Sequence, residues 1–202
     1  MASYDPIAAE YAAEFEHELD RKPFDRKMLA WLIERVDGII CDMGCGPGQV
    51  ARYLHSQGAQ TCGIDISAEM VRHARRLNPE IHFATGDMQA LTGVADGAFA
   101  GIAAFYSILH IPRDQVVSVL TELRRVLKPD GVLLLAFHVG NGTVHKDEWW
   151  DKPVSIDFLF FTSEEMKANL AAAGFTLTEA IERDPYPEVE YPSRRAYIFA
   201  RV

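Results

Sequence analysis

Few cysteines and no long apolar run are the first features of this sequence. The 202 residues include only Cys41, Cys45 and Cys62, and an odd number fits neither a disulfide framework nor a paired C-x-x-C zinc site. No apolar run approaches the roughly 18 residues that a membrane span needs. The first residues also lack the basic and apolar segments of a signal peptide. We therefore expect a reduced, cytoplasmic protein that does not associate with membranes.

Basic side chains are also scarce. The chain has 20 Lys and Arg residues against 29 Asp and Glu, which gives a net charge of -9, and it contains no basic run. Because nucleic-acid binding depends on basic groups that contact phosphates, we expect no DNA or RNA partner. No cluster of His, Asp and Glu has the spacing of a metal site, so we expect no metal. The remaining composition, 49% hydrophobic and 24% charged, is typical of a soluble globular domain.

Short apolar segments alternate with segments of helical periodicity, which predicts an α/β fold with a largely parallel sheet. The expected strands are residues 39–41, 61–66, 81–85, 99–105, 132–138, 175–180 and 196–202. Expected helices include residues 49–55, 67–77 (capped by Ser67), 112–127 and 163–173. Residues 139–157 and 184–193 show no regular pattern, and an irregular stretch as long as the first is usually functional or disordered.

A glycine-rich turn carries the strongest chemical signal. Residues 42–48, Asp-Met-Gly-Cys-Gly-Pro-Gly, come directly after an expected strand and directly before an expected helix. Glycines allow a ligand to approach the backbone closely, and a helix N-terminus offers free N–H groups. The dinucleotide fingerprint G-x-G-x-x-G requires a glycine at the position of Gln49, so the match to a nicotinamide enzyme is imperfect. No Gly-Lys-Ser/Thr follows, which excludes a P-loop.

Carboxylates follow the next two expected strands. Asp65 ends the second strand, 21 residues after Gly44, the spacing at which an acidic side chain accepts hydrogen bonds from ribose hydroxyls in nucleotide-binding α/β folds. Asp87 follows the third strand, where a carboxylate can accept a hydrogen bond from an adenine amino group. Each of these residues alone is more simply explained as a turn or cap residue. Together they occur at the ends of successive strands. Such folds bind ligands at this edge of the sheet, so the pattern predicts a nucleotide-like ligand.

Taken together, these motifs and two others resemble those of class I S-adenosylmethionine-dependent methyltransferases. The matching segments are residues 39–48 (IICDMGCGPG), 63–67 (GIDIS), 85–88 (TGDM), 107–111 (SILHI) and 127–131 (LKPDG). The resemblance is close over residues 35–140 and loose elsewhere. Many members of the family have Phe-Asp at the start of the fourth strand, where this chain has Phe99-Ala100.

The resemblance implies a Rossmann-like seven-stranded sheet in the order 3-2-1-4-5-7-6, with the last strand antiparallel and helices on both faces. It implies one methyltransferase domain over residues 1–202. Within it, residues 1–36 form helices that cover the site, residues 37–138 form the cofactor-binding core, and residues 139–202 supply the acceptor-side loop, a helix and the last two strands. The implied cofactor is S-adenosyl-L-methionine.

The resemblance also assigns residues to the nucleoside part of the cofactor. Asp65 is expected to accept hydrogen bonds from the ribose hydroxyls. Ile66 and Met70 are expected to enclose the adenine, and Asp87 with the backbone N–H of Met88 to bind its edge.

Other residues are assigned to the methionyl part. By the resemblance, Gly44, Cys45 and Gly46 pack against this part, and Asp42 holds its amino group indirectly. The remaining cofactor-binding residues by resemblance are Tyr11, which covers the cofactor, and Phe105 and His110 beside the methionyl group.

The acceptor side is expected near the ends of the fourth and fifth strands and in the irregular stretch. A methyl transfer to an O–H or ammonium acceptor requires a proton acceptor, and histidine is the commonest one near neutral pH. The candidate catalytic residues are His138, His110, His145 and Tyr106. Each histidine also fits a purely structural role.

Three further side chains are candidates for substrate binding besides Tyr106. Trp149 and Trp150 fit the wall of an apolar pocket or the core equally well. Arg195 fits a clamp for a carboxylate of the acceptor or, more simply, a surface ion pair.

The sequence therefore predicts methyl transfer from S-adenosylmethionine to a small-molecule acceptor by in-line displacement, with a histidine as a possible general base. A cofactor-binding protein without catalysis and a nicotinamide-dependent oxidoreductase remain as alternatives. The acceptor atom and the oligomeric state are left open.

Overall fold

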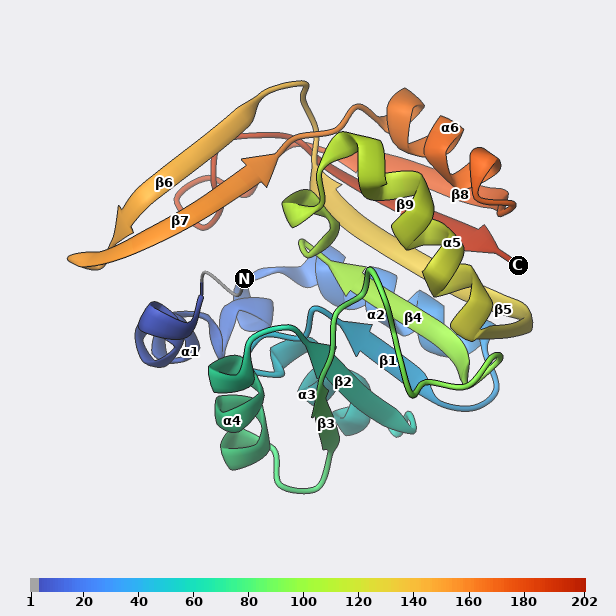
Figure 1. Cartoon of the computed structure of the whole chain (residues 1–202), viewed down its shortest axis with the longest axis horizontal. Helices are drawn as coiled ribbons and strands as arrows, with labels where there is room; N and C mark the ends of the chain where they lie inside the picture. The colour runs from blue at the N-terminus through green and yellow to red at the C-terminus, as the bar shows by residue number, and fades with distance from the viewer. Residues whose placement is uncertain (1–3) are drawn as a thin grey trace.

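One seven-stranded sheet organises the computed structural model, which describes residues 4–202 (Figure 1). The strand order is β3-β2-β1-β4-β5-β9-β8. The strands are β1 Ile40–Met43, β2 Thr61–Asp65, β3 His82–Thr85, β4 Phe99–Phe105, β5 Leu127–His138, β8 Thr176–Arg183 and β9 Arg195–Arg201.

Strand directions match the predicted fold. β1 pairs in parallel with β2 and β4, and β4 pairs in parallel with β5. β9 is antiparallel to both of its neighbours, β5 and β8. When the two strands outside this sheet are left out of the count, the order is 3-2-1-4-5-7-6, so the predicted Rossmann-like α/β fold is confirmed.

Helices cover both faces of the sheet. α5 and α6 pack against one face, and α2 and α3 pack against the other. α4 begins after Ser67, whose Oγ accepts a hydrogen bond from the backbone N–H of Met70 at 3.0 Å, which confirms the predicted cap. The helices are α2 Pro23–Arg35, α3 Gln49–Ser56, α4 Ala68–Leu77, α5 Val116–Val126 and α6 Ser163–Ala172.

The apolar sequence of β5 follows from its place in the middle of the sheet. Successive side chains of a strand point to opposite faces. Leu133, Leu135 and Phe137 therefore lie in the core under α5 and α6, whereas Val132 and Leu134 lie in the core under α2. A strand segment that is buried on both faces needs apolar residues at every position, as residues 132–137 have, and the polar side chain of His138 follows at the carboxyl end of the strand.

A separate β-hairpin replaces the irregular stretch predicted for residues 139–157. β6 (Thr143–Trp149) and β7 (Lys152–Leu159) pair only with each other and extend away from the sheet (Figure 1). The prediction of a long loop here was wrong. The turn at Trp150 and Asp151 uses positive φ angles at both residues without a glycine, so it lacks the usual sequence signal of a hairpin.

The segment that precedes the sheet lies beside this hairpin. It contains η1 (Asp5–Ile7), α1 (Ala8–Phe15) and η2 (Glu18–Arg21). α1 packs on α4 (Figure 1). η1 contacts β7. Residues 184–193, by contrast, form only turns, as predicted.

Within residues 4–202, no helix is long and apolar enough to cross a membrane. Nor does this part of the chain bring together three or more His, Cys, Asp or Glu side chains in an arrangement that would hold a metal ion.

Candidate active site

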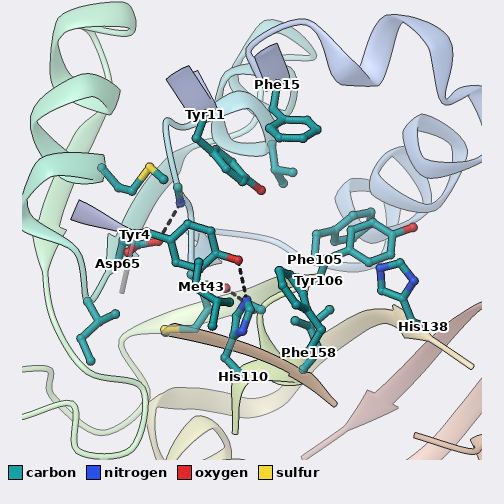
Figure 2. Close-up of a pocket in the computed structure, with 18 of the residues that line it drawn as sticks. Tyr4, Tyr11, Phe15, Met43, Asp65, Phe105, Tyr106, His110, His138 and Phe158 are labelled. Carbon is teal, nitrogen blue, oxygen red and sulfur yellow. Dashed lines mark hydrogen bonds between the residues drawn. The ribbon is translucent and has the colours of Figure 1, made fainter. Parts of the chain in front are cut away.

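A cavity of about 620 Å³ opens at the carboxyl ends of the parallel strands. Gly44, Asp65, Tyr106 and His138, which follow or end β1, β2, β4 and β5, all line it. Carboxyl ends of adjacent parallel strands meet at one edge of a sheet, which is why residues far apart in the sequence converge here. Figure 2 shows the cavity, with Asp65 on one side and His138 on the other.

The glycine turn after β1 forms one wall. The backbone N–H groups of Gly44 and Cys45 both donate to the carbonyl of Ile64, at 2.8 and 3.1 Å. Gly44 has a φ of +74°, and a Cβ atom at this position would lie 2.4 Å from the Cβ of Ser107. The turn therefore requires glycine both for its backbone conformation and for its close approach to Ser107.

Asp65 lies directly beside this turn. Its two carboxylate oxygens accept hydrogen bonds from the backbone N–H groups of Gly46 and Ser67, each at 2.8 Å. Burial raises the pKa of Asp65, although these two N–H groups act in the opposite direction. An ionised carboxylate offers about four acceptor positions, so about two remain for a ligand.

Apolar side chains continue the wall beyond Asp65. Ile66, Met70 and Met88 line the cavity together with Asp87, whose carboxylate accepts a hydrogen bond from the backbone N–H of Gln89 at 2.8 Å. Ile66 is 47% exposed although it is a large apolar residue beside a cavity. An apolar face left open in this way suits a flat, weakly polar ring.

Two predicted cofactor-binding side chains lie behind the wall rather than in it. Asp42 is 1% exposed and accepts a hydrogen bond from the backbone N–H of Ala51 at 3.0 Å, so it holds the first turn of α3. Burial raises its pKa to about 8. Cys45 is 3% exposed and packs among α3, α4 and β3, and burial also raises the pKa of its thiol. The position of Asp42 agrees with an indirect role. Cys45 contributes its backbone to the turn, and its side chain packs in the core and does not line the cavity.

Aromatic side chains from the N-terminal segment and the hairpin cover the Asp65 half of the cavity. The ring of Trp149 on β6 lies 5.9 Å from that of Tyr11 on α1 and 6.4 Å from that of Tyr4. Lys152, at the start of β7, binds Glu10 on α1 at 2.7 Å and the carbonyl of Pro6 at 2.9 Å. These contacts link the hairpin to the N-terminal segment.

His110 connects this cover to the sheet. Its Nδ1 lies 2.9 Å from the carbonyl oxygen of Asp157, and its Nε2 lies 3.1 Å from the hydroxyl of Tyr4 (Figure 2). A carbonyl only accepts hydrogen bonds, so Nδ1 carries the proton and Nε2 accepts from Tyr4. Burial lowers the pKa of His110, which keeps the imidazole neutral. Both nitrogens are therefore engaged within the protein.

Aromatic rings also enclose the opposite half. His138 stacks on Phe160 with 5.0 Å between ring centroids and 14° between planes, and its ring lies 5.4 Å from Tyr106 and 5.9 Å from Tyr191. Burial and the neighbouring cation of Arg195 lower the pKa of His138 to about 3. The imidazole is therefore neutral at neutral pH and weak as a proton acceptor.

Charged side chains beneath these rings neutralise one another. The carboxylate of Asp25 is buried and lies 2.9 Å from the guanidinium of Arg183, which also binds Glu190 at 2.6 and 2.8 Å. Tyr197 donates to Asp25, and Tyr106 donates to it at 3.3 Å. Burial raises the pKa of Asp25, whereas Arg183 holds the pKa of Glu190 low against the effect of burial.

The structure brings most of the predicted site residues together around this cavity. Those that line it are Tyr11, Gly44, Gly46, Asp65, Ile66, Met70, Asp87, Met88, Phe105, Tyr106, His110, His138, Trp149 and Arg195.

Two other predicted residues do not line the cavity. His145 is half-exposed on β6, where its Nδ1 lies 2.8 Å from the carboxylate of Asp157. Trp150 stacks on Trp149 at 4.8 Å, on the side away from the cavity. His145 alternates with Val144 and Lys146, which line the cavity, so its side chain points to the other face of the hairpin. Trp150 lies in the turn after β6, where its ring packs on that of Trp149 instead of lining the cavity.

Sequence reasoning missed several aromatic residues of the site, namely Tyr4, Phe158, Phe160 and Tyr191. A signal for two of them was present. Ile156, Phe158 and Phe160 alternate with other residues in the pattern of a half-buried strand. Tyr191 lies in an irregular stretch without such a pattern.

Comparisons with known proteins agree with this geometry. Residues 40–131 match the family described as "Methyltransferase domain". A malonyl-[acyl-carrier protein] O-methyltransferase from Enterobacter lignolyticus is 32% identical over 58% of this chain and 45% of its own length. A 2-methyl-6-phytyl-1,4-hydroquinone methyltransferase from Synechocystis is also 32% identical, over 67% of this chain and 45% of its own. The chain thus spans about half the length of the curated relatives it matches.

A solved structure supports the fold. The S-adenosylmethionine-dependent methyltransferase from Methanosarcina mazei superposes with a TM-score of 0.73 over 82% of this chain and 92% of its own, at 19% sequence identity.

The residues on the Asp65 side of the cavity fit S-adenosylmethionine. The glycine turn leaves room for a close ligand, the Asp65 carboxylate keeps free acceptor positions for a diol, and Ile66 presents an uncovered apolar face. The family match covers the glycine turn and these strand-end residues. Residues 40–131 are therefore similar in sequence to a methyltransferase domain, and the residues of this half of the cavity fit S-adenosylmethionine as the cofactor.

Proposed function

We propose that this chain transfers a methyl group from S-adenosylmethionine to a small-molecule acceptor. One observation carries the proposal. A single cavity joins a half that suits the cofactor, around Asp65, to a second half walled by Tyr106, His138 and Phe160. Only an arrangement of this kind lets two bound molecules meet in line and away from water.

The cofactor half is assigned to named residues. Asp65 would hold the ribose hydroxyls, Ile66 and Met70 would enclose the adenine, and Asp87 with the backbone N–H of Met88 would bind the adenine edge. S-adenosylmethionine, when bound, supplies a sulfonium methyl group, and the acceptor's lone pair forms the new bond as the carbon–sulfur bond breaks and its electron pair returns to sulfur.

The cover over the site favours a small acceptor. Tyr11 and Trp149 lie on one side of the cavity and Phe160 and Tyr191 on the other, and an enclosure by aromatic rings suits a small ligand. We assign the cover to residues 1–36, the cofactor-binding core to residues 37–138 and the acceptor side to residues 139–202 of one domain. The Synechocystis relative is named for a hydroquinone, which is a small molecule and not a macromolecule.

A turnover assay tests this proposal. The protein is incubated with S-adenosylmethionine labelled in the methyl group and with a panel of metabolites that differ in acceptor atom. We expect S-adenosylhomocysteine to form only when an acceptor is present, with the label in the acceptor. If S-adenosylhomocysteine binds but no acceptor in the panel is labelled, the chain is a cofactor-binding protein without this activity.

A further inference from the structure

A short chain of hydrogen bonds determines where His138 carries its proton. Its Nδ1 lies 2.7 Å from the Oγ of Ser193, and the same Oγ lies 2.8 Å from Nη1 of Arg195. A guanidinium only donates hydrogen bonds, so the serine oxygen accepts from Arg195. The hydroxyl proton of Ser193 then has one acceptor in reach among the described residues, which is Nδ1 of His138.

The other ring nitrogen is consequently the donor. A neutral imidazole that accepts at Nδ1 carries its proton at Nε2. Nε2 has no hydrogen-bond partner within residues 4–202, and His138 lines the cavity. Burial, with the cations of Arg195 and Lys22 nearby, outweighs the carboxylate of Glu190, and this keeps the pKa of His138 low and the ring neutral.

The carboxylates of the same half are already engaged. Asp25 accepts from Arg183, Tyr197 and Tyr106. Glu190 accepts from both terminal nitrogens of Arg183 and from the backbone N–H of Tyr186.

Glu18, at the edge of this half, is engaged as well. Its two oxygens bind Lys22 at 2.5 Å and the side-chain amide of Gln49 at 2.9 Å. Across the described residues, this half of the cavity therefore presents an N–H donor to a ligand and no free strong base.

We propose that His138 donates a hydrogen bond to the acceptor substrate, and that this substrate is an oxygen acid ionised at neutral pH, with a carboxylate as the simplest case. The proposal rests on the proposed function and names its substrate class. Ser193 and Arg195 are positioning residues that act through His138.

The chemistry of such an acceptor agrees with this site. One carboxylate oxygen accepts the hydrogen bond from Nε2, and a lone pair of the other forms the new oxygen–carbon bond. The carbon–sulfur bond breaks, its electron pair returns to sulfur, and the negative and positive charges cancel. No proton is released, so no base is required. An ammonium acceptor, in contrast, must lose a proton before it reacts, and the N–H of His138 cannot accept one.

Nitrogen NMR of the histidine side chains tests the donor without any methyl transfer. The imidazole signals of His138 are assigned by their loss in His138→Gln. We expect Nε2 to appear protonated and Nδ1 unprotonated from pH 8 down to about pH 5. In Ser193→Ala, where the fixed partner is lost, we expect the two tautomers to mix. A proton on Nδ1 in the wild type, or titration near the ordinary pKa of histidine, would overturn the assignment.

A matched pair of variants separates a donor from a base in the turnover assay. The side-chain amide of glutamine reaches about as far as Nε2 and donates, whereas leucine fills space only. We expect His138→Gln to keep kcat/KM for a carboxylate acceptor within about tenfold of wild type and His138→Leu to lose at least about 100-fold, with binding of S-adenosylhomocysteine unchanged in both. Equal large losses in both variants would contradict the donor role.

The substrate class is tested with acceptors of one carbon skeleton that differ only in carboxylate, alcohol or amine. We expect labelled methyl ester from the carboxylate and at least a 100-fold lower rate with the amine. Preferential labelling of the amine or alcohol would overturn the assigned class. If no compound in any class is labelled, the proposed function fails and the substrate class with it, while the NMR result alone decides the donor at His138.

Discussion

At the scale of single residues, the cofactor half depends on positions that tolerate no side chain. Gly44 combines a φ of +74° with a Ser107 Cβ that lies 2.4 Å from where its own Cβ would be. Ser107 cannot easily move away, because its Oγ is hydrogen-bonded to the carbonyl of Met43 at 2.7 Å. The turn and Ser107, two residues after the end of β4, therefore hold each other in place.

Substitution of this glycine tests the argument. We expect Gly44→Ala to lower the free energy of unfolding by at least about 1–2 kcal/mol, the penalty of a left-handed backbone, and to weaken S-adenosylhomocysteine binding at least about tenfold. Gly142→Ala is the control, because nothing lies within 4 Å of the Cβ that it adds. Chemical denaturation and calorimetry measure both quantities. Equal behaviour of the two variants would refute the steric account.

A second residue-scale prediction concerns pH. The folded protein holds the pKa of His138 at about 3, below the roughly 6.5 of an unfolded chain. Between these values the unfolded state binds one more proton, so this residue lowers stability by up to about 1.4 kcal/mol for each unit that the pH falls below 6.5.

His138→Gln removes this dependence. We expect the stability of the variant, measured by urea denaturation between pH 7 and pH 5, to fall less steeply than that of the wild type. His145→Gln is the control, since this exposed histidine lies outside the cavity. Parallel curves for wild type and His138→Gln would show that folding does not lower the pKa of His138.

At the scale of elements, the hairpin β6–β7 is an addition that closes the site rather than a part of the sheet. It pairs only with itself, and its links to the N-terminal segment run through Lys152 and Trp149. The long loop expected here was wrong, because the segment forms two regular strands beside the cavity. Its turn residues, Trp150 and Asp151, carry no hairpin signal, and only the alternation around Phe158 indicated a strand.

The two tryptophans of this hairpin provide a matched comparison. Trp149 faces the cavity and Trp150 stacks behind it. We expect Trp149→Ala to weaken S-adenosylhomocysteine binding about tenfold, or roughly 1.4 kcal/mol, and Trp150→Ala to weaken it less than threefold. Calorimetry of both variants measures the difference. A larger loss in Trp150→Ala would mean that the hairpin does not cover the cofactor as described.

At the scale of the whole molecule, the site joins segments from Tyr4 to Arg195. The cofactor half was predictable because a parallel sheet places the ends of β1, β2 and β3 at one edge, and each end carries a short motif. The acceptor half was not predictable in the same way. His138 was expected at the end of β5, but its proton position depends on Ser193, in a stretch of turns without periodicity.

The central claim is that the Asp65 half of the cavity binds S-adenosylmethionine, and titration calorimetry with S-adenosylhomocysteine tests it most directly. Wild type, Asp65→Asn and the exposed control Glu69→Gln are titrated, with NADH as a second ligand. We expect S-adenosylhomocysteine to bind wild type and the control equally, NADH not to bind, and Asp65→Asn to lose about 2–3 kcal/mol of affinity, the value of charge-assisted hydrogen bonds. Absence of S-adenosylhomocysteine binding, a preference for NADH, or unchanged affinity in Asp65→Asn would contradict the account.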